Sequence, residues 1–223
     1  MIALLTMTAD HLAWAFLPTV SLGAALLHLA GRIAMPVFCF LLAEGAAHTR
    51  HAGRYAFRLA GCALLSAIPY SLLVSGTPLG APFSAAYTLL LSLAALRCIR
   101  SSLDPLVRVM LLIPLLFFSQ FGDWGIYAVG WCVLFSLVQE RQLCGVLFLL
   151  LTLCNTARFA LPLIGTADPF TLFCEAGIQL GSLLALPLIF RCNGRRRRPG
   201  RGVQFLEYLY YPLHLALIDL FLF

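Results

Sequence analysis

Ionisable side chains interrupt the long apolar runs of this sequence at only a few places. Asp10 and His11 lie in the middle of the first run, and His214 lies in the last run, close after Tyr211. An imidazole takes up and returns protons near neutral pH, and a carboxylate bonded to one ring nitrogen fixes which nitrogen carries the hydrogen. Asp10, His11 and His214 are therefore our catalytic candidates. Asp219 lies near the end of the last run, where we expect it to be solvated.

Asp10 and His11 cannot both face the same partner, because neighbouring residues on a helix point about 100° apart. We expect one of them to face a reaction centre and the other to contact a neighbouring helix. Two ionisable residues side by side in apolar surroundings are poorly explained by packing, since burying a charge is costly. Their position favours function.

A second set of polar residues comprises candidates for substrate binding: Arg32, Glu44, Asp123 and Tyr211. Arg32 lies near one end of the second run, and its guanidinium, which is always charged, predicts an anionic partner. Asp123 is a possible partner, although an aspartate in this position also commonly caps a helix. Glu44 lies about 18 Å further along the same helix, so it marks the opposite end. Pro212, beside Tyr211, removes a backbone donor and exposes carbonyls that a cavity could use.

Arg50, Arg54 and Arg58 are spaced four residues apart, so they share one face of a helix. Guanidinium groups match phosphate oxygens in a two-pronged way, which predicts a site for the phosphates of a cofactor. Arginines that lie along lipid would show the same spacing, and the sequence leaves the two interpretations even. No metal is expected, because the sequence pattern around His48 and His51 offers no carboxylate or cysteine as a further ligand.

The composition places these residues in a membrane. Hydrophobic residues make up 61% of the 223 and charged residues only 11%, with a mean hydropathy of +0.94. A soluble domain is about half apolar and about a quarter charged. A water-soluble globular protein and a disordered chain are both excluded, and a polytopic membrane protein remains.

A transmembrane helix needs about 20 mostly apolar residues. The apolar runs predict an all-α polytopic transmembrane helix bundle with about nine spans, of which the fifth and sixth are short: 2–20, 29–46, 55–74, 85–99, 106–118, 125–138, 143–163, 170–190 and 205–222. With the N-terminus in the cytoplasm, 13 of the 15 arginines lie in cytoplasmic connections, including the run 195–198. Of the other two arginines, Arg158 lies in an outer connection and Arg32 lies at the edge of a span. This excess of arginine on the cytoplasmic side is what the positive-inside rule requires. We predict one integral membrane domain over residues 1–223.

The polar motifs, taken in order, resemble the TraX family of membrane-embedded acetyltransferases, named for the F-pilin acetylase of conjugative plasmids. The resemblance rests on these segments: Thr8-Ala-Asp-His11, Gly31-Arg-Ile-Ala-Met-Pro-Val-Phe38, Ala43-Glu-Gly-Ala-Ala-His-Thr-Arg50, Ile68-Pro-Tyr70, Tyr87-Thr-Leu-Leu-Leu91, Asp123-Trp-Gly-Ile-Tyr127, Leu186-Pro-Leu-Ile189, Asn193-Gly194 and Tyr210-Tyr-Pro-Leu-His214. It covers nearly the whole chain.

The resemblance implies transfer of an acetyl group from acetyl-CoA, as co-substrate, to an acceptor such as the amino terminus of a pilin-like peptide or an envelope molecule. It also implies a multi-pass protein of the bacterial inner membrane, with His11 as catalytic base beside Asp10. Two departures stand out. The family often has a glutamate where this chain has Ala67, and often an asparagine where it offers Ser84, Ala85 and Ala86. The acceptor therefore need not be a pilin.

Our hypothesis is acetyl transfer across the lipid bilayer, without nucleic acid. The cytoplasmic arginines would meet the phosphates of acetyl-CoA, and His11, or less favourably His214, would take the proton of the acceptor or carry the acetyl group. Arg32 would stabilise the oxyanion or anchor an acceptor carboxylate. A transporter for a small solute or proton is the alternative, since polar residues at the midplane and a proline-broken helix fit it too. A non-catalytic scaffold of a pilus or envelope assembly is a third, weaker reading.

Overall fold

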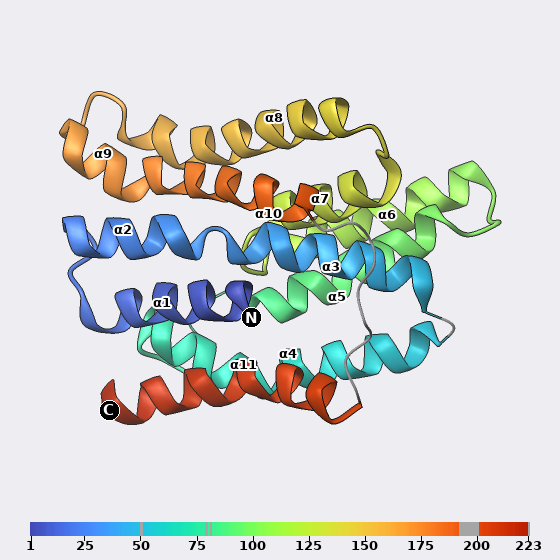
Figure 1. The fold of residues 1–223 in the computed structure, drawn as a ribbon, viewed down its shortest axis with the longest axis horizontal. Coiled ribbons are helices and arrows are strands. Elements are labelled where there is room, and N and C mark those ends of the chain that lie inside the picture. The colour runs from blue at the N-terminus through green and yellow to red at the C-terminus, as the bar shows by residue number, and fades with distance from the viewer. Residues whose placement is uncertain (50, 79, 81, 192–200, 223) are drawn as a thin grey trace. The chain divides into compact units, whose positions relative to one another are not determined.

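The computed structural model describes residues 1–49, 51–78, 80, 82–191 and 201–222, and within them the chain is helical with one isolated β-bridge and no strand (Figure 1). The chain divides into two compact units, each built from two separate stretches. Unit 1 comprises Met1–Phe38 and Val138–Cys192, and unit 2 comprises Cys39–Leu137 and Asn193–Phe223. The single domain that we predicted over residues 1–223 stays a prediction.

Unit 1 is built around a helical hairpin of α1 and α2, which lie side by side (Figure 1). The helix η2 packs against both α2 and α8. A Cβ on Gly181 of η2 would overlap the backbone carbonyl of Leu29, so a glycine is needed where η2 meets α2. The elements of unit 1 are α1 (Ile2–Phe16), α2 (Leu22–Gly31), the first residues of α3 (Ala34–His48), α8 (Arg141–Ala160), η1 (Leu161–Leu163), α9 (Pro169–Glu175), η2 (Gly177–Leu184) and α10 (Ala185–Arg191).

Three helices of unit 1, α2, α8 and α9, begin where a polar side chain accepts hydrogen bonds from exposed backbone amides. The Ser21 hydroxyl accepts a hydrogen bond from the amide of Ala24 and so caps α2. The Glu140 carboxylate accepts two amide hydrogens at the start of α8, and Asp168 does the same for α9. These caps fix the places at which the apolar helices begin.

Unit 2 is organised around α4, which packs along α11 and α5 (Figure 1). Pro212 of α11 has no amide hydrogen, so the Tyr208 carbonyl lacks its helical donor. The thiol of Cys62 on α4 lies 3.5 Å from that carbonyl and donates to it, which uses the carbonyl that we expected a cavity to use. The elements of unit 2 are the remainder of α3, α4 (Ala52–Ser75), α5 (Ala85–Ile99), α6 (Pro105–Ser119), α7 (Gly125–Leu137) and α11 (Arg201–Leu222).

Every predicted span coincides with a helix or a helix pair, but their lengths differ. Four are long and apolar enough to cross a membrane: Leu22–His48, Ala52–Ser75, Arg141–Leu163 and Gly202–Leu222. A fifth is added if α9 and the following Gly177–Arg191 count as one span, bent by 46°. The remaining predicted spans are the shorter apolar helices α1, α5, α6 and α7. The described residues are thus those of an all-helical membrane protein, and among them are four or five helices of crossing length.

The second span begins earlier than its predicted start at residue 29. Because Ser21 caps α2, the helix begins at Leu22 and includes His28. It is interrupted between α2 and α3, where Pro36 lacks the amide hydrogen that would bond the Arg32 carbonyl. The interruption leaves Arg32 at the C-terminal end of α2 and not within a continuous helix.

Candidate functional site

A buried ionic cluster lies between α1 and α2 of unit 1. Nδ1 of His28 lies 2.8 Å from Oδ1 of Asp10, and Nη1 of Arg32 lies 3.6 Å from Oδ2 of the same carboxylate. The three residues are 2%, 9% and 9% exposed for His28, Asp10 and Arg32. The first contact is a hydrogen bond, whereas the second is a longer charge contact. One carboxylate therefore stands between an imidazole and a guanidinium, shielded from solvent.

Helical spacing positions this cluster. His28 and Arg32 are four residues apart on α2, so both face α1. Gly31 lies between them, and a Cβ built on it would stand 2.6 Å from Oδ1 of Asp10, so the absence of a side chain there makes room for the carboxylate. Trp14, one turn after Asp10, has its ring 4.9 Å from the His28 ring at a tilt of 51°. The His28 imidazole is thus held by two residues of α1, one helix turn apart: Asp10 through a hydrogen bond and Trp14 through a ring contact.

Asp10 makes the contact to a neighbouring helix that we expected of one of the first two polar residues. His11 is also buried, at 7% exposure, on the same helix. The two carboxylate oxygens of Asp10 contact His28 and Arg32, so the carboxylate orients His28. The carboxylate found beside Arg32 is Asp10, where the sequence had suggested Asp123.

His28 is a site residue that the sequence does not predict, because the predicted second span begins at Leu29, one residue after it. Two signals could have found it. The apolar run begins at Leu22 directly after Ser21, a common helix cap. His28 and Arg32 also have the four-residue spacing that places two nitrogen-bearing polar side chains on one helix face.

A second buried cluster, in unit 2, consists of hydroxyl groups. The hydroxyl oxygens of Ser66 on α4 and Ser84, the N-cap of α5, lie 2.8 Å apart and share a hydrogen bond. The Tyr211 hydroxyl on α11 lies close to Ser84 and within electrostatic range of Asp123. Two of the predicted substrate-binding residues, Tyr211 and Asp123, thus lie in the same region of unit 2. Ser84 lies at one of the positions where the sequence departs from the asparagine common in the resembled family.

The turn that contains Asp123 is fixed by its backbone. The Asp123 amide donates to the Phe83 carbonyl at 2.7 Å, and the Thr88 hydroxyl donates to the Asp123 carbonyl at 2.7 Å. Trp124 has a φ of 66°, a left-handed conformation that is uncommon for a residue with a side chain. The surrounding hydrogen bonds hold this conformation against its cost.

His214 is bound to its own helix. Its Nδ1 lies 2.9 Å from the Tyr210 carbonyl, and its ring stacks on the Tyr210 ring with centroids 5.1 Å apart. Tyr211 flanks it at 5.6 Å. Asp219, for which we expected solvent, is instead only 8% exposed, and neither of its carboxylate oxygens bonds to any residue that the structure describes. Asp219 is therefore more buried than its position in the sequence indicates.

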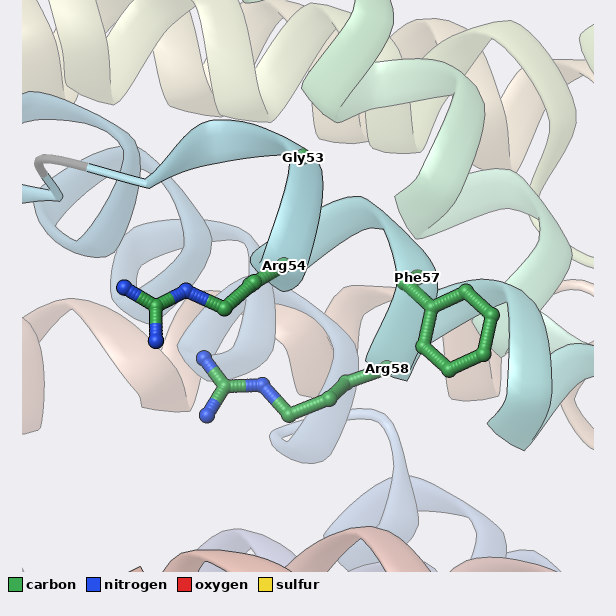
Figure 2. A pocket seen from close by; sticks show the side chains of 4 residues that line it. All are labelled: Gly53, Arg54, Phe57 and Arg58. Atoms are coloured by element: carbon green, nitrogen blue, oxygen red, sulfur yellow. The ribbon is translucent and has the colours of Figure 1, made fainter.

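The predicted phosphate-binding face begins α4. Arg54 and Arg58 point to the same side of the helix and line a pocket of about 340 Å³ with Gly53 and Phe57 (Figure 2). Arg50, the third predicted member, lies outside the described residues. Glu44 is half-buried near the end of α3, with its Oε2 4.0 Å from Nδ1 of His48.

The two described arginines differ in their contacts. Nη1 of Arg58 donates to Oε1 of Gln204 at 3.2 Å, and its guanidinium lies over the rings of Tyr55 and Tyr208 at 5.9 and 5.5 Å. Arg58 therefore ties α4 to α11. Arg54 is exposed and makes no hydrogen bond or ion pair with the described part of the chain, which leaves its guanidinium available to an anion. Among the described residues, no group of three or more His, Cys, Asp or Glu side chains could hold a metal ion.

Comparison with known proteins tests the resemblance noted in the sequence. The model of the family described as TraX protein matches residues 1–221. This chain belongs to the TraX family. It is also similar to the probable fimbrial assembly protein FimC, serogroup H1, of Dichelobacter nodosus, with 28% identity over 228 residues that cover 97% of this chain and 91% of that protein. No solved structure matches.

The first two TraX-like motifs of the sequence are the ones that meet in unit 1. Asp10 belongs to the motif Thr8-Ala-Asp-His11, and Arg32 to the motif that begins at Gly31. The Asp10 side chain packs against Gly31, where a Cβ would overlap it, and the Arg32 guanidinium contacts Oδ2 of Asp10. The TraX resemblance at the N-terminus therefore corresponds to one buried ionic cluster on two adjacent helices.

Proposed function

We propose that this TraX-family protein is a membrane-embedded acetyltransferase that moves an acetyl group from acetyl-CoA to an amine of a pilin-like peptide or another envelope molecule. The observation that carries the proposal is the cluster of Asp10, His28 and Arg32, buried between apolar helices. An ionisable group costs about 2.5–3.5 kcal/mol at the centre of a membrane helix, so three such groups together favour a chemical role. The name of the Dichelobacter relative, a fimbrial assembly protein, supports an acceptor in the cell envelope.

Acyl transfer to an amine has two requirements that these residues can meet. The attacking nitrogen must lose a proton, and the described helices contain three buried imidazoles that are suited to accept it, those of His11, His28 and His214. The thioester carbonyl develops negative charge as the nitrogen attacks, and the Arg32 guanidinium is a cation that can stabilise it. Asp10 supplies the countercharge that allows Arg32 to be buried.

We further propose nine crossings of the bacterial inner membrane with the N-terminus in the cytoplasm. In that topology Arg54, Arg58 and Arg50 lie on the side where acetyl-CoA is made, and the pocket beside Arg54 and Phe57 is the site for its phosphates. Glu44 lies near the same side, while Asp123 and Tyr211 lie toward the acceptor side. The four short helices would cross only where the bilayer is thin or the helices extend beyond their described ends.

The test compares the masses of envelope proteins and peptides between cells with and without the gene. We expect molecules that are heavier by one acetyl group only where the gene is present. Arg54→Gln should lower the acetylated fraction, because it removes an unpaired guanidinium from the proposed phosphate site. Arg158→Gln is the matched control: it removes an exposed arginine from unit 1, on the side opposite to acetyl-CoA in our topology, and should leave the fraction unchanged.

Identical envelope masses in the two strains would contradict the proposal. The rival function, transport of a small solute or proton, is favoured by the interrupted helices: α2 breaks before α3, and the pair of α9 and Gly177–Arg191 bends by 46°. Transporters use such discontinuous helices at their binding sites. Unchanged masses together with gene-dependent solute uptake into membrane vesicles would therefore support the transporter.

A further inference from the structure

We propose that His28 is the general base that takes the proton from the acceptor amine, and that Asp10 fixes the tautomer in which it does so. The inference rests on the proposed acetyl transfer and deepens it, since it assigns the proton transfer to an imidazole that the family motifs quoted above do not contain. It starts from one contact, the 2.8 Å hydrogen bond between Nδ1 of His28 and Oδ1 of Asp10.

The hydrogen bond determines which ring nitrogen is available. A carboxylate accepts, so Nδ1 of His28 carries the hydrogen and Nε2 keeps its lone pair. No residue in the described part of the chain forms a hydrogen bond with Nε2. This is the arrangement of a base oriented by a carboxylate: one nitrogen is anchored, the other is free to accept a proton, and the carboxylate stabilises the imidazolium that results.

The residues around His28 and Asp10 favour the neutral imidazole with its hydrogen on Nδ1. Arg32 contacts the second oxygen of Asp10, so the carboxylate and the guanidinium offset each other's charge and a neutral imidazole completes the cluster without net charge. Trp14 packs against the ring, and Gly31 lets the carboxylate approach α2. Few alternative positions remain for the His28 ring, which is 2% exposed.

The proton transfer balances without a further reactant. The acceptor nitrogen attacks the thioester carbonyl carbon, the C–N bond forms, and Nε2 of His28 receives the proton that the nitrogen loses. The C–S bond then breaks, and the same proton passes from Nε2 to the leaving thiolate, which gives CoA as the free thiol and the acetylated amine. His28 returns to its starting tautomer, and Asp10 stays ionised throughout.

His28→Asn separates this role from a structural one. The asparagine amide can donate to Asp10 from nearly the position of Nδ1, but it has no group that replaces Nε2. If His28 only satisfies Asp10, the variant should keep both stability and activity. If His28 is the base, the variant should keep its melting temperature within a few degrees and lose about 100-fold or more of its rate, the usual contribution of a general base.

The assay uses the full-length chain in membrane vesicles from host cells that lack the gene, so that the natural acceptor is present. Acetyl-CoA labelled in the acetyl group is supplied to the cytoplasmic side, and label in envelope material is measured over time. We expect the maximal rate to fall in His28→Asn while the KM for acetyl-CoA stays near that of the unsubstituted protein. Asn155→Ala is the control, because it removes the buried hydrogen bond to Gln179 in the same unit, 3.4 Å long, without touching the cluster. It should lower stability and retain the rate.

Each outcome decides a separate question. No label transfer by the unsubstituted protein overturns the proposed function and this assignment with it. An active unsubstituted protein with an equally active His28→Asn variant overturns the assignment alone. If the variant does not fold, nitrogen-15 spectra of the histidine-labelled unsubstituted protein decide: a hydrogen on Nδ1 and none on Nε2 of His28 is expected, and the opposite tautomer contradicts the assignment.

Discussion

The two compact units each contain a buried cluster of polar side chains, and the two clusters differ in kind. The cluster of unit 1 is ionic, with Asp10 held between His28 and Arg32, whereas the cluster between α4, α5 and α11 of unit 2 consists of the hydroxyls of Ser66, Ser84 and Tyr211. A buried charge is costly even when paired, while a hydroxyl that finds a partner is nearly neutral in free energy. In our proposal the ionic cluster takes part in the chemistry, while the hydrogen bond between Ser66 and Ser84 contributes to helix packing.

The largest expected effect comes from closing the space in which the ionic cluster sits. Gly31→Ala places a methyl group against the Asp10 side chain, which must move away from His28 and Arg32. We expect a loss of about 1–3 kcal/mol, as for other overpacked sites, and a loss of acetyl transfer. Thermal unfolding of the purified protein in detergent measures the first and the vesicle assay the second.

Gly61→Ala is the matched control for this substitution. Gly61 lies inside α4 of unit 2, and a Cβ there meets nothing within 4 Å. The alanine should leave stability unchanged or raise it by up to about 1 kcal/mol, because alanine favours the helix. Equal melting temperatures for the two variants would mean that Gly31 does not set the approach of α1 to α2.

A smaller effect is expected in the hydroxyl cluster. Ser66→Ala removes the hydrogen bond to Ser84, and a neutral hydrogen bond contributes about 1 kcal/mol. A double-mutant cycle with Ser84→Ala, followed by thermal unfolding, should give a coupling energy of that size. A coupling energy as large as the effect of Gly31→Ala would remove the contrast between the two units.

The smallest effect is expected at an exposed carboxylate of unit 1. Asp168 caps α9, and hydrogen bonds from the Thr171 hydroxyl and amide hold the pKa of its carboxyl below the usual range. Because the folded-state pKa is the lower one, this contribution to stability is present at neutral pH and disappears as the pH falls below about 4. Asp168→Ala should lower the melting temperature slightly at pH 7. A difference from the unsubstituted protein that persists at low pH would show that the effect is not electrostatic.

The helices could be predicted from the sequence because each apolar run is bounded by polar or helix-breaking residues. The predictions failed where spacing across helices matters. Asp10 is unusual in the sequence because it interrupts an apolar run, whereas its partner His28 lies just before the predicted start of the second span at Leu29, and the helix in fact begins after the cap at Ser21. Asp219 was expected in solvent because position along a run does not reveal how neighbouring helices cover it.

Ser84 is a second residue whose contacts could not be predicted from the sequence. In the sequence it lies where the TraX family often has an asparagine, and no neighbouring residue indicates that its hydroxyl would be buried in a cluster. In the fold it occupies the N-cap position of α5, and its hydroxyl forms a hydrogen bond with Ser66 and lies beside Tyr211. These contacts join residues from three helices that are far apart along the chain, so a reading of local patterns cannot find them.

The short connection between α1 and α2 has a consequence for biosynthesis. Residues 17–21 join the helix that holds Asp10 to the helix that holds both of its partners. As α2 leaves the ribosome directly after α1, the carboxylate can meet its counterion before either helix settles in lipid. The hairpin of α1 and α2, in which the charges of Asp10 and Arg32 offset each other, would then insert into the bilayer as one unit. A mutation at His28 or Arg32 would therefore impair membrane insertion during synthesis.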